Sequence, residues 1–257
     1  MYDEKQLVSR VTTWVLACAE YARQNVEQIQ DIKQKSGEYD LVTNLDTTIE
    51  AKIEAQIHKH YPDALIIGEE APKQHLTTAQ GLTFFVDPID GTLNLVKKRD
   101  CFAIMIGVYD GERPICGAIM DVMKNQLYWG GPNIGVYCND TPVTPPEDSL
   151  LKDGLVGVSW RQFLGNRFNE IKIAQKSAGI RVMGSAGLEF IEIMNGKHIA
   201  YLATLNPWDF AAGQILAESL GLKVVKTDGN RLNRFKTNHI IAATPTAYQQ
   251  IRRLQHF

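Results

Sequence analysis

Residues 82–92 read LTFFVDPIDGT, an apolar run that ends in two carboxylates, a glycine and a hydroxyl. The segment Leu82–Val86 has the length and composition of a buried strand. A turn after such a strand needs one Asp and one Gly, so the second carboxylate and the hydroxyl of Thr92 need another explanation. We therefore expect Asp87 and Asp90 to be functional residues delivered by the end of a buried strand.

Four further carboxylates stand at the ends of other predicted elements. Glu69 and Glu70 follow the apolar run Ala64–Ile67, whereas Asp46 and Asp209 lie at the starts of predicted helices. Each alone has an ordinary explanation, because Glu-Glu pairs are commonly solvated and an Asp at a helix start is commonly a cap. Carboxylates that converge from neighbouring strand ends repel one another, however, unless a cation neutralises them.

The chemistry of this set indicates phosphate-ester hydrolysis with Mg²⁺. Oxygen ligands without Cys or His favour a hard cation, so Mg²⁺ ranks ahead of Zn²⁺. Gly91 and Thr92 supply backbone N–H groups at a predicted helix start, which is a favourable seat for phosphate. The chain contains no G-x-S-x-G, G-x-x-x-x-G-K-[ST] or H-E-x-x-H motif, so the enzyme classes that depend on them are not expected.

Composition excludes several other classes. The 257 residues carry 27 Lys plus Arg and 29 Asp plus Glu, a formal net charge of −2, so no nucleic-acid partner is expected. No apolar run is long enough for a transmembrane helix, so no membrane partner is expected. The four cysteines contain no C-x-x-C pair and are typical of reduced, buried thiols, which predicts a cytoplasmic protein.

Periodicity and breaker residues predict alternating helices and strands. A helical stripe begins at Leu7 and is expected to end near Lys33–Gly37, and a second helix begins with a capping box at Thr43. The remaining predicted elements are strands over 64–67, 82–86, 103–109, 115–121, 126–129, 180–183, 198–204, 223–225 and 239–243, and helices over 167–177, 185–195, 207–220 and 245–256. This alternation predicts a sheet layered with helices.

One proline-rich segment is the predicted boundary between two halves. The stretch Asn139–Asp148 carries three prolines and few apolar residues. We therefore predict an N-terminal α+β half over 1–145 that carries most metal ligands. The C-terminal α/β half, 146–257, would carry Asp209 and the residues on the substrate side.

Four motifs in order resemble the inositol monophosphatase family, within the wider group of lithium-sensitive and fructose-bisphosphatase-like phosphatases. They are Asp40–Asp46, Gly68-Glu69-Glu70, the segment 87–94 and Trp208–Gly213. The resemblance covers essentially the whole chain. It implies an α+β fold, the layered αβαβα sandwich of that group, as well as a homodimer and inhibition by lithium.

The resemblance implies two or three Mg²⁺ ions in one site. Glu69, Asp87 and the main-chain carbonyl of Ile89 would hold the first ion. Asp87, Asp90 and Asp209 would hold the second, and Glu69 would help to place a weaker third. Two ions about 4 Å apart can activate a water and stabilise the leaving oxygen of a phosphate ester.

The resemblance also implies catalytic and substrate-binding roles. Thr92 and Asp46 would orient the attacking water, and Glu70 would act in the surrounding shell. The implied substrate contacts are Ile89, Asp90, Gly91, Thr92, Gly184, Ser185, Ala186 and Lys35. The expected substrate is inositol monophosphate or a related small phosphate monoester.

Two departures from the family pattern leave the substrate open. In animal members a Glu seven residues before the Trp-Asp aspartate contacts inositol hydroxyls, and this chain has Leu202 there. Poor discrimination among polyols is therefore expected. The basic residues Lys97, Lys98 and Arg99 form either a solvated turn or a contact for a second phosphate.

Several alternatives remain beside inositol monophosphate. NADP(H), fructose 1,6-bisphosphate and 3′-phosphoadenosine compounds could be hydrolysed at the same site. A haloacid-dehalogenase-type phosphatase would need Asp-x-Asp, whereas Asp87 and Asp90 have two residues between them. A non-catalytic protein that binds metal or a phosphorylated ligand is a distant alternative, because such a protein would be expected to have lost a ligand residue.

Overall fold

The computed structural model describes residues 2–35, 41–70 and 80–255. Its helices are α1 (Glu4–Asn25), α2 (Asn44–His60), α3 (Thr92–Lys98), α4 (Trp160–Gly165), α5 (Glu170–Lys176), α6 (Ala186–Met194), α7 (Pro207–Ser219) and α8 (Pro245–Gln255), with 3₁₀ turns at Val26–Gln28 and Leu151–Asp153. None of these helices is long and apolar enough to cross a membrane.

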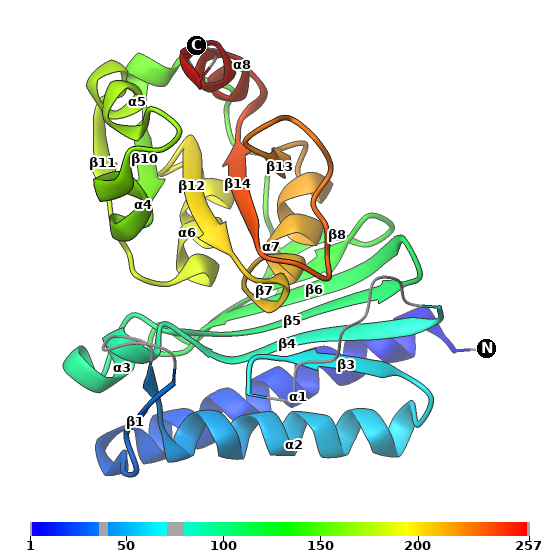
Figure 1. The fold of residues 1–257 in the computed structure, drawn as a ribbon. Helices are drawn as coiled ribbons and strands as arrows, with labels where there is room; N and C mark the ends of the chain where they lie inside the picture. Colours follow the sequence, from blue (N-terminus) through cyan, green and yellow to red (C-terminus); the bar gives the residue numbers. More distant parts are fainter. Residues whose placement is uncertain (1, 36–40, 71–79, 256–257) are drawn as a thin grey trace.

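Two large sheets and the helices stack in five layers, as Figure 1 shows. Helices α1 and α2 cover the outer face of a seven-stranded sheet, and α6 and α7 lie between that sheet and a five-stranded one. Helices α4, α5 and α8 cover the outer face of the five-stranded sheet. The order of layers confirms the predicted αβαβα sandwich.

The seven-stranded sheet contains the predicted meander. Its strands, in spatial order, are β3 (Leu65–Gly68), β4 (Leu82–Asp90), β5 (Ala103–Asp110), β6 (Arg113–Asp121), β7 (Gln126–Gly131), β8 (Gly135–Cys138) and β9 (Thr141–Pro142). Neighbouring strands are antiparallel, except that β3 and β4 are parallel. Strands β4 to β6 are apolar along nearly their whole length because helices cover both faces of the sheet. The prediction missed β8, which is four residues long and partly buried, and β9, which is two residues long and exposed.

The five-stranded sheet is mixed. Its spatial order is β11 (Gly179–Arg181), β10 (Leu155–Val158), β12 (Ala200–Leu205), β14 (Asn238–Ala243) and β13 (Lys223–Lys226). Strand β10 is parallel to both of its neighbours, whereas β14 is antiparallel to both β12 and β13. The sequence prediction missed β10 and α4, both of which are six residues long or shorter and lack a clear period.

The predicted extension of the first helix to Lys33–Gly37 is wrong. Helix α1 ends at Asn25, although apolar residues continue at helical spacing to Ile29. The backbone N–H of Gln30 instead donates to Asn44 Oδ1 at 2.9 Å. Strand β1 (Lys33–Gln34) then pairs with β2 (Leu41–Val42). Contacts with a later segment of the chain thus take the place of the helix that the periodicity predicted. Gly37 lies outside the described residues.

Close packing of α7 on the seven-stranded sheet places the first turn of α7 near the end of β4. A Cβ at Gly107 would lie 2.7 Å from the backbone nitrogen of Ala212, and a Cβ at Gly117 would lie 2.6 Å from its carbonyl oxygen. Only glycine at these two strand positions lets the helix backbone approach so closely. The start of α7 therefore lies where a side chain can reach the carboxylates that follow β4.

Candidate active site

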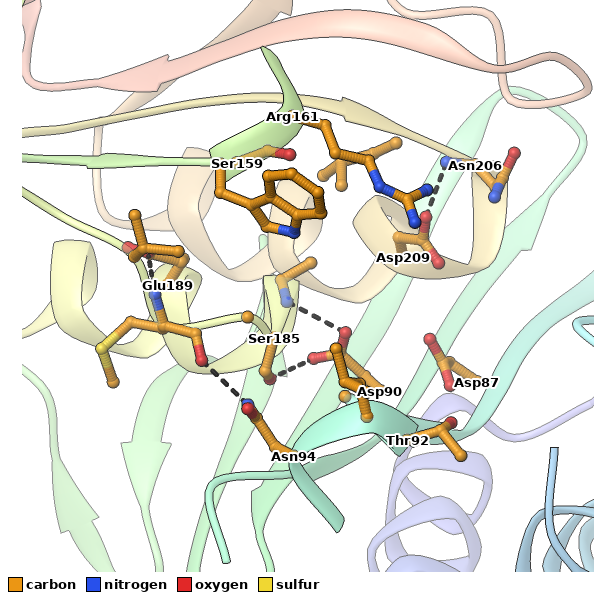
Figure 2. A pocket seen from close by; sticks show the side chains of 18 of the residues that line it. Asp87, Asp90, Thr92, Asn94, Ser159, Arg161, Ser185, Glu189, Asn206 and Asp209 are labelled. Carbon is orange, nitrogen blue, oxygen red and sulfur yellow. Dashed lines mark hydrogen bonds between the residues drawn. The ribbon is translucent and has the colours of Figure 1, made fainter. Parts of the chain in front are cut away.

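A cavity of about 540 Å³ lies between the two sheets, at the end of β4. Figure 2 shows that side chains from β4, α3, α4, α6 and α7 surround it. Five carboxylates line this cavity: Glu69, Asp87, Asp90, Glu189 and Asp209. A cavity of this size suits a small organic ligand.

An irregularity in β4 lets both aspartates of the motif reach the cavity. Asp87 pairs with Met105 and Asp90 pairs with Ala103, so two residues of β4, Pro88 and Ile89, oppose one of β5. Residues three apart in a regular strand would point to opposite faces of the sheet. The extra residue re-aims the strand, and both carboxylates line the same cavity.

Gly91 connects this strand to α3 through a left-handed backbone conformation. Its φ is +100°, and a Cβ there would lie 3.2–3.3 Å from Ser185 and Gly184. A side chain is therefore disfavoured by both conformation and space. The sharp turn places Thr92 as the first residue of α3, directly beside the carboxylates.

The hydroxyl of Thr92 donates to a buried carboxylate. Thr92 Oγ1 lies 2.9 Å from Asp46 Oδ1 and 3.1 Å from the carbonyl oxygen of Ile89. Asp46 is fully buried, and its other oxygen accepts from the backbone N–H and the hydroxyl of Thr43. This is the predicted capping box of α2. Asp46 therefore lies behind Thr92 and does not line the cavity itself.

Asp90 anchors the start of α6. Its carboxylate accepts from the hydroxyl of Ser185 and from the backbone N–H groups of Ala186 at 2.9 Å and Gly187 at 2.6 Å. Ser185 and Ala186 line the cavity, but the hydroxyl hydrogen of Ser185 and the N–H hydrogen of Ala186 both point at Asp90. The carboxylate of Asp90 thus joins the end of β4 to the start of α6.

Asn94 and Glu189 hold the loop before α6 from either side. Asn94 Nδ2 donates to the carbonyl oxygens of Cys101 and Met183, both at 2.8 Å. Glu189 accepts from the backbone N–H of Met183 at 3.1 Å and contacts His198 Nδ1 at 2.9 Å. The sequence analysis identified neither role, because the loop these residues hold is distant in sequence from Asn94.

Lys35 bridges the two glutamates that follow β3. Its ammonium donates to Glu69 Oε1 at 2.8 Å and also to Glu70 Oε1. The backbone N–H of Glu70 donates to Glu50 Oε1 at 3.0 Å. Glu69 lines the cavity, whereas Lys35 and Glu70 lie just outside its lining. Burial lowers the pKa of Lys35, but the two glutamates outweigh burial and raise it.

The acidic cluster is electrostatically unfavourable in the absence of a cation. Burial raises the pKa of Glu69 to about 7, although Lys35 opposes this rise. Burial and repulsion from neighbouring carboxylates raise the pKa of Asp87 and Asp209 well above the ordinary value. Burial also raises the pKa of Asp90, against the hydrogen bonds from Ser185, Gly187 and Ala186. These shifts follow from placing like charges in an apolar surrounding.

The donor set fits a hard cation. The buried oxygen Asp87 Oδ1 has no hydrogen-bond partner among the described residues. Asp209 Oδ2 accepts from the backbone N–H of Asn206 at 2.7 Å, which leaves its other oxygen for a ligand. As they stand, no three Asp, Glu, His or Cys side chains of the described residues are grouped tightly enough to hold a metal ion. Lys35 and the N–H groups of α6 instead engage Glu69 and Asp90.

Comparison with known proteins places this site in a family. A model of the inositol monophosphatase family matches residues 3–257. The chain belongs to the inositol monophosphatase family. Its relatives include the inositol-1-monophosphatase of Bacillus subtilis, 28% identical over 243 residues that cover 93% of this chain and 92% of the relative. The Nus factor SuhB of Salmonella typhimurium is 31% identical over 217 residues, or 82% of this chain and 80% of the relative.

A solved structure has the same fold. The IMPase/NADP phosphatase complexed with Mg²⁺ and phosphate superposes with a TM-score of 0.89. It is 22% identical and covers 98% of this chain and 95% of its own. The architecture predicted by resemblance to the inositol monophosphatase family is thereby confirmed.

The structure corrects one expectation about substrate selection, which concerns Leu202, and bears on one open alternative, which concerns Lys97 and Lys98. Leu202 is fully buried in an apolar cluster with Val156 and Ile241 on the outer face of the five-stranded sheet. It does not line the cavity, so the selection of a substrate must depend on other residues. Lys97 and Lys98 are exposed in the last turn of α3 and outside the lining, which favours solvated residues over a contact for a second phosphate. Arg99 donates to two carbonyl oxygens at the end of α3.

The sequence analysis missed several lining residues, of which Trp160 and Arg161 carry the largest side chains on α4. Trp160 and Arg161 begin α4, immediately after β10, and both line the cavity. The signal that identified Asp87 was also present here, since Ser159-Trp160-Arg161 follows the apolar run Leu155–Val158. That run is short and interrupted by Gly157, so it is a weak signal for a buried strand.

Proposed function

We propose that this chain is a Mg²⁺-dependent phosphomonoesterase that hydrolyses a small phosphate monoester by direct attack of water. The observation that supports it best is the pairing of Thr92 with Asp46, at 2.9 Å, beside a buried cluster of carboxylates in one cavity. Family membership supports the same reaction class. The names of the relatives include phosphatases, and one solved structure holds Mg²⁺ and phosphate.

The oxygen donors at the end of β4 would hold the ions. We assign Glu69, Asp87, Asp209, Asp90 and the carbonyl oxygen of Ile89 to this role. The bound cations would neutralise the cluster and stabilise negative charge on the phosphate and on the leaving oxygen. Asp87 Oδ1 has no hydrogen-bond partner in the part of the chain that the structure describes, and this supports the assignment, because burying an unpaired carboxylate oxygen is costly without a cation.

Thr92 would orient the attacking water. An aliphatic hydroxyl ionises far above neutral pH, so Thr92 is not a strong base by itself. Its proton is directed at Asp46, and its oxygen retains a lone pair that can accept a hydrogen bond from water. Asp46 is in turn held by Thr43, so the acceptor direction of Thr92 is set by the start of α2. Positioning of this kind contributes about 10²–10⁴-fold to the rate.

The remaining predicted residues would shape the phosphate and substrate side. Gly91 brings the start of α3 against the cavity, and Asp90 holds Ser185 and Ala186 in the lining. Gly184 lines the cavity in a left-handed conformation beside Asn94. Lys35 and Glu70 would act around the site by balancing the charge of Glu69. The number of ions, inhibition by lithium, the homodimer and the cytoplasmic location remain predictions.

A substrate panel tests this function. Phosphate release is measured with inositol 1-phosphate, NADP, fructose 1,6-bisphosphate and a 3′-phosphoadenosine compound, with Mg²⁺ and with EDTA. We expect turnover of at least one substrate that requires Mg²⁺ and disappears in Asp87→Asn. If no substrate is hydrolysed by protein that binds Mg²⁺, the chain is a non-catalytic member of the family and our proposal is wrong.

A further inference from the structure

Helix α4 carries Trp160 and Arg161 to the cavity, although little apolar packing anchors it. It is six residues long, and a helix of this length is not stable by itself. Most of its residues are exposed, Leu164 by 73%, and Phe163 is only partly buried. The one buried side chain of the helix is polar, that of Gln162. Hydrogen bonds of this buried amide are therefore expected to hold α4 in place.

The amide of Gln162 is hydrogen-bonded on both sides. Its Nε2 donates to Glu170 Oε1 at 2.9 Å, and its Oε1 accepts from the hydroxyl of Thr204 at 3.0 Å. Glu170 is 1% exposed in the first turn of α5, and its other oxygen accepts from the backbone N–H of Phe168. Thr204 lies near the end of β12 and lines the cavity. The amide thus joins α4 to α5 and to the five-stranded sheet.

His239 completes a chain of hydrogen-bonded side chains, the Gln162 chain, which consists of Glu170, Gln162, Thr204 and His239. The register of β12 and β14 places His239 opposite Thr204, and its Nδ1 lies 2.6 Å from the Thr204 hydroxyl oxygen. Its ring packs on Phe168, with 4.9 Å between the ring centroids. Burial and the nearby Arg167 lower the pKa of His239, although Glu170 opposes them, so the ring is neutral at pH 7.

The donors and acceptors of the Gln162 chain allow one direction of hydrogen bonding. The carboxylate of Glu170 can only accept, so the amide of Gln162 turns its NH₂ group toward Glu170 and its oxygen toward Thr204. Thr204 must then donate to Gln162, and its oxygen accepts from His239. The neutral imidazole of His239 therefore carries its proton on Nδ1. Because every group has a partner, the Gln162 chain favours a single placement of α4.

We propose that Gln162 is a positioning residue of the site, which holds α4 so that Trp160 and Arg161 face the cavity. The guanidinium carbon of Arg161 lies 5.3 Å from the centre of a Trp160 ring, so the two side chains form one surface. Figure 2 shows Arg161 on the side of the cavity where Asn206 and Asp209 lie. Gln162 does not line the cavity and acts only through that surface.

Displacement of α4 would change the binding of substrate and leave the carboxylates at the end of β4 in place. Those carboxylates are held by other contacts, as Asp90 is by the start of α6. The expected signature of a lost Gln162 chain is therefore a higher KM with little change in kcat or in the requirement for Mg²⁺. This inference rests on the proposed phosphatase function.

Kinetics of Gln162→Met test the proposal, because methionine keeps the length of the side chain and removes both hydrogen bonds. We expect KM to rise about five- to thirtyfold for the substrate that wild type hydrolyses best, with kcat within about threefold. Gln250→Met is the matched control. Gln250 Oε1 accepts from the backbone N–H of Leu151 at 2.6 Å, outside the cavity lining, so this variant should keep the wild-type KM.

Two measurements do not depend on turnover. Amide hydrogen exchange over residues 159–166 should be at least about fivefold faster in Gln162→Met than in wild type or Gln250→Met. Thr204→Val removes the hydroxyl at the other end of the same bond and should accelerate exchange in the same way. Nitrogen NMR should find the His239 proton on Nδ1 in wild type and on Nε2 in Gln162→Met, where Thr204 is free to donate to Nδ1. His239→Gln assigns that signal.

Three results would overturn the proposal. They are unchanged exchange over 159–166 in both variants, the same His239 tautomer in wild type and Gln162→Met, and a Gln162→Met protein that is less stable but has the wild-type KM. The last result would give Gln162 a role in stability alone. If wild type hydrolyses no substrate, the proposed function is wrong, and the exchange and tautomer results then decide whether Gln162 positions α4.

Discussion

Thr92 is the residue on which the proposed water attack depends most directly. We expect Thr92→Ala to keep the fold and bind Mg²⁺ but to lose about two to four orders of magnitude in kcat, because only positioning is removed. Thr92 starts α3 and is buried beside Asp46, so the change leaves a small polar gap and no new charge. Steady-state phosphate release at saturating Mg²⁺ measures this effect.

Thr92→Ser is the matched control, because it keeps the hydroxyl and deletes only the methyl group. It should retain turnover within about tenfold of wild type. Full activity in Thr92→Ala would remove both Thr92 and Asp46 from the mechanism. Equal inactivity of the two variants would show that the methyl group, and not the hydroxyl, is what the site requires.

Asp209 combines a structural hydrogen bond with a proposed ligand role, and one substitution separates the two. In Asp209→Asn the amide oxygen can still accept from the backbone N–H of Asn206, so the cap of α7 is preserved. The negative charge is lost, and we expect the Mg²⁺ concentration needed for half-maximal activity to rise at least about ten- to hundredfold. A magnesium titration of initial rates measures this shift, and an unchanged titration would exclude Asp209 as a ligand.

At the scale of elements, the contact between α7 and α6 makes alanine less favourable than glycine at position 213 of α7. Replacing a glycine inside a helix with alanine stabilises most helices by about 0.5–1 kcal/mol. A methyl group at Gly213, however, would overlap the buried ring of Phe190. Overpacking costs about 1–3 kcal/mol, so we expect Gly213→Ala to destabilise the protein by about 1–2 kcal/mol in urea unfolding.

Two further proteins show whether Phe190 causes that loss. Gly165 is the last residue of α4, and a methyl group there would meet open space. The variant Gly165→Ala should therefore differ from wild type by less than about 0.5 kcal/mol in free energy of unfolding. In a double-mutant cycle, Phe190→Leu should make Gly213→Ala less destabilising than it is in wild type. Strictly additive effects would mean that the two residues do not interact.

At the scale of the whole molecule, the acidic cluster couples stability to pH and Mg²⁺. The folded-state pKa of Glu69 is about 7, against an ordinary value of 4.5, and those of Asp87 and Asp209 are also raised. Between these values the folded state binds more protons than the unfolded state, so stability falls as pH rises. For Glu69 the contribution is fully present below about pH 4.5 and is lost as pH passes about 7.

We therefore expect the midpoint of thermal unfolding in EDTA to fall between pH 5 and pH 8, and Mg²⁺ to reverse most of that fall. Stabilisation by an ion at a hundredfold excess over its Kd is about 2.7 kcal/mol. It should be larger at pH 8 than at pH 5, because protons compete for the same oxygens. Glu69→Gln should flatten the slope in EDTA, and an equal Mg²⁺ effect at both pH values would contradict this account.

The fold and the acidic residues of the site were predictable because their signals are local. A buried strand followed by Asp87 and Asp90, and a capping box at Asp46, can each be identified within about ten residues of sequence. The order of four such motifs then identified the family, which the match over residues 3–257 confirms. These motifs can be recognised without knowing which segments pack together, because each lies within one short stretch of sequence.

Other features were decided only by the tertiary structure, since they depend on contacts between distant segments or on strand register. The backbone of Gln30 is hydrogen-bonded to Asn44 at the start of α2, and α1 ends before it. The ammonium of Lys35 contacts Glu69, which is 34 positions away in the sequence. Side chains alternate between the two faces of a strand. In β12, Leu202 therefore points to the outer face of the sheet and is buried away from the cavity. The family resemblance had instead implied that position 202 lies beside the substrate. The sequence by itself thus determined the acidic chemistry of this protein. The packing of α4 against the cavity decided that Trp160 and Arg161 face it.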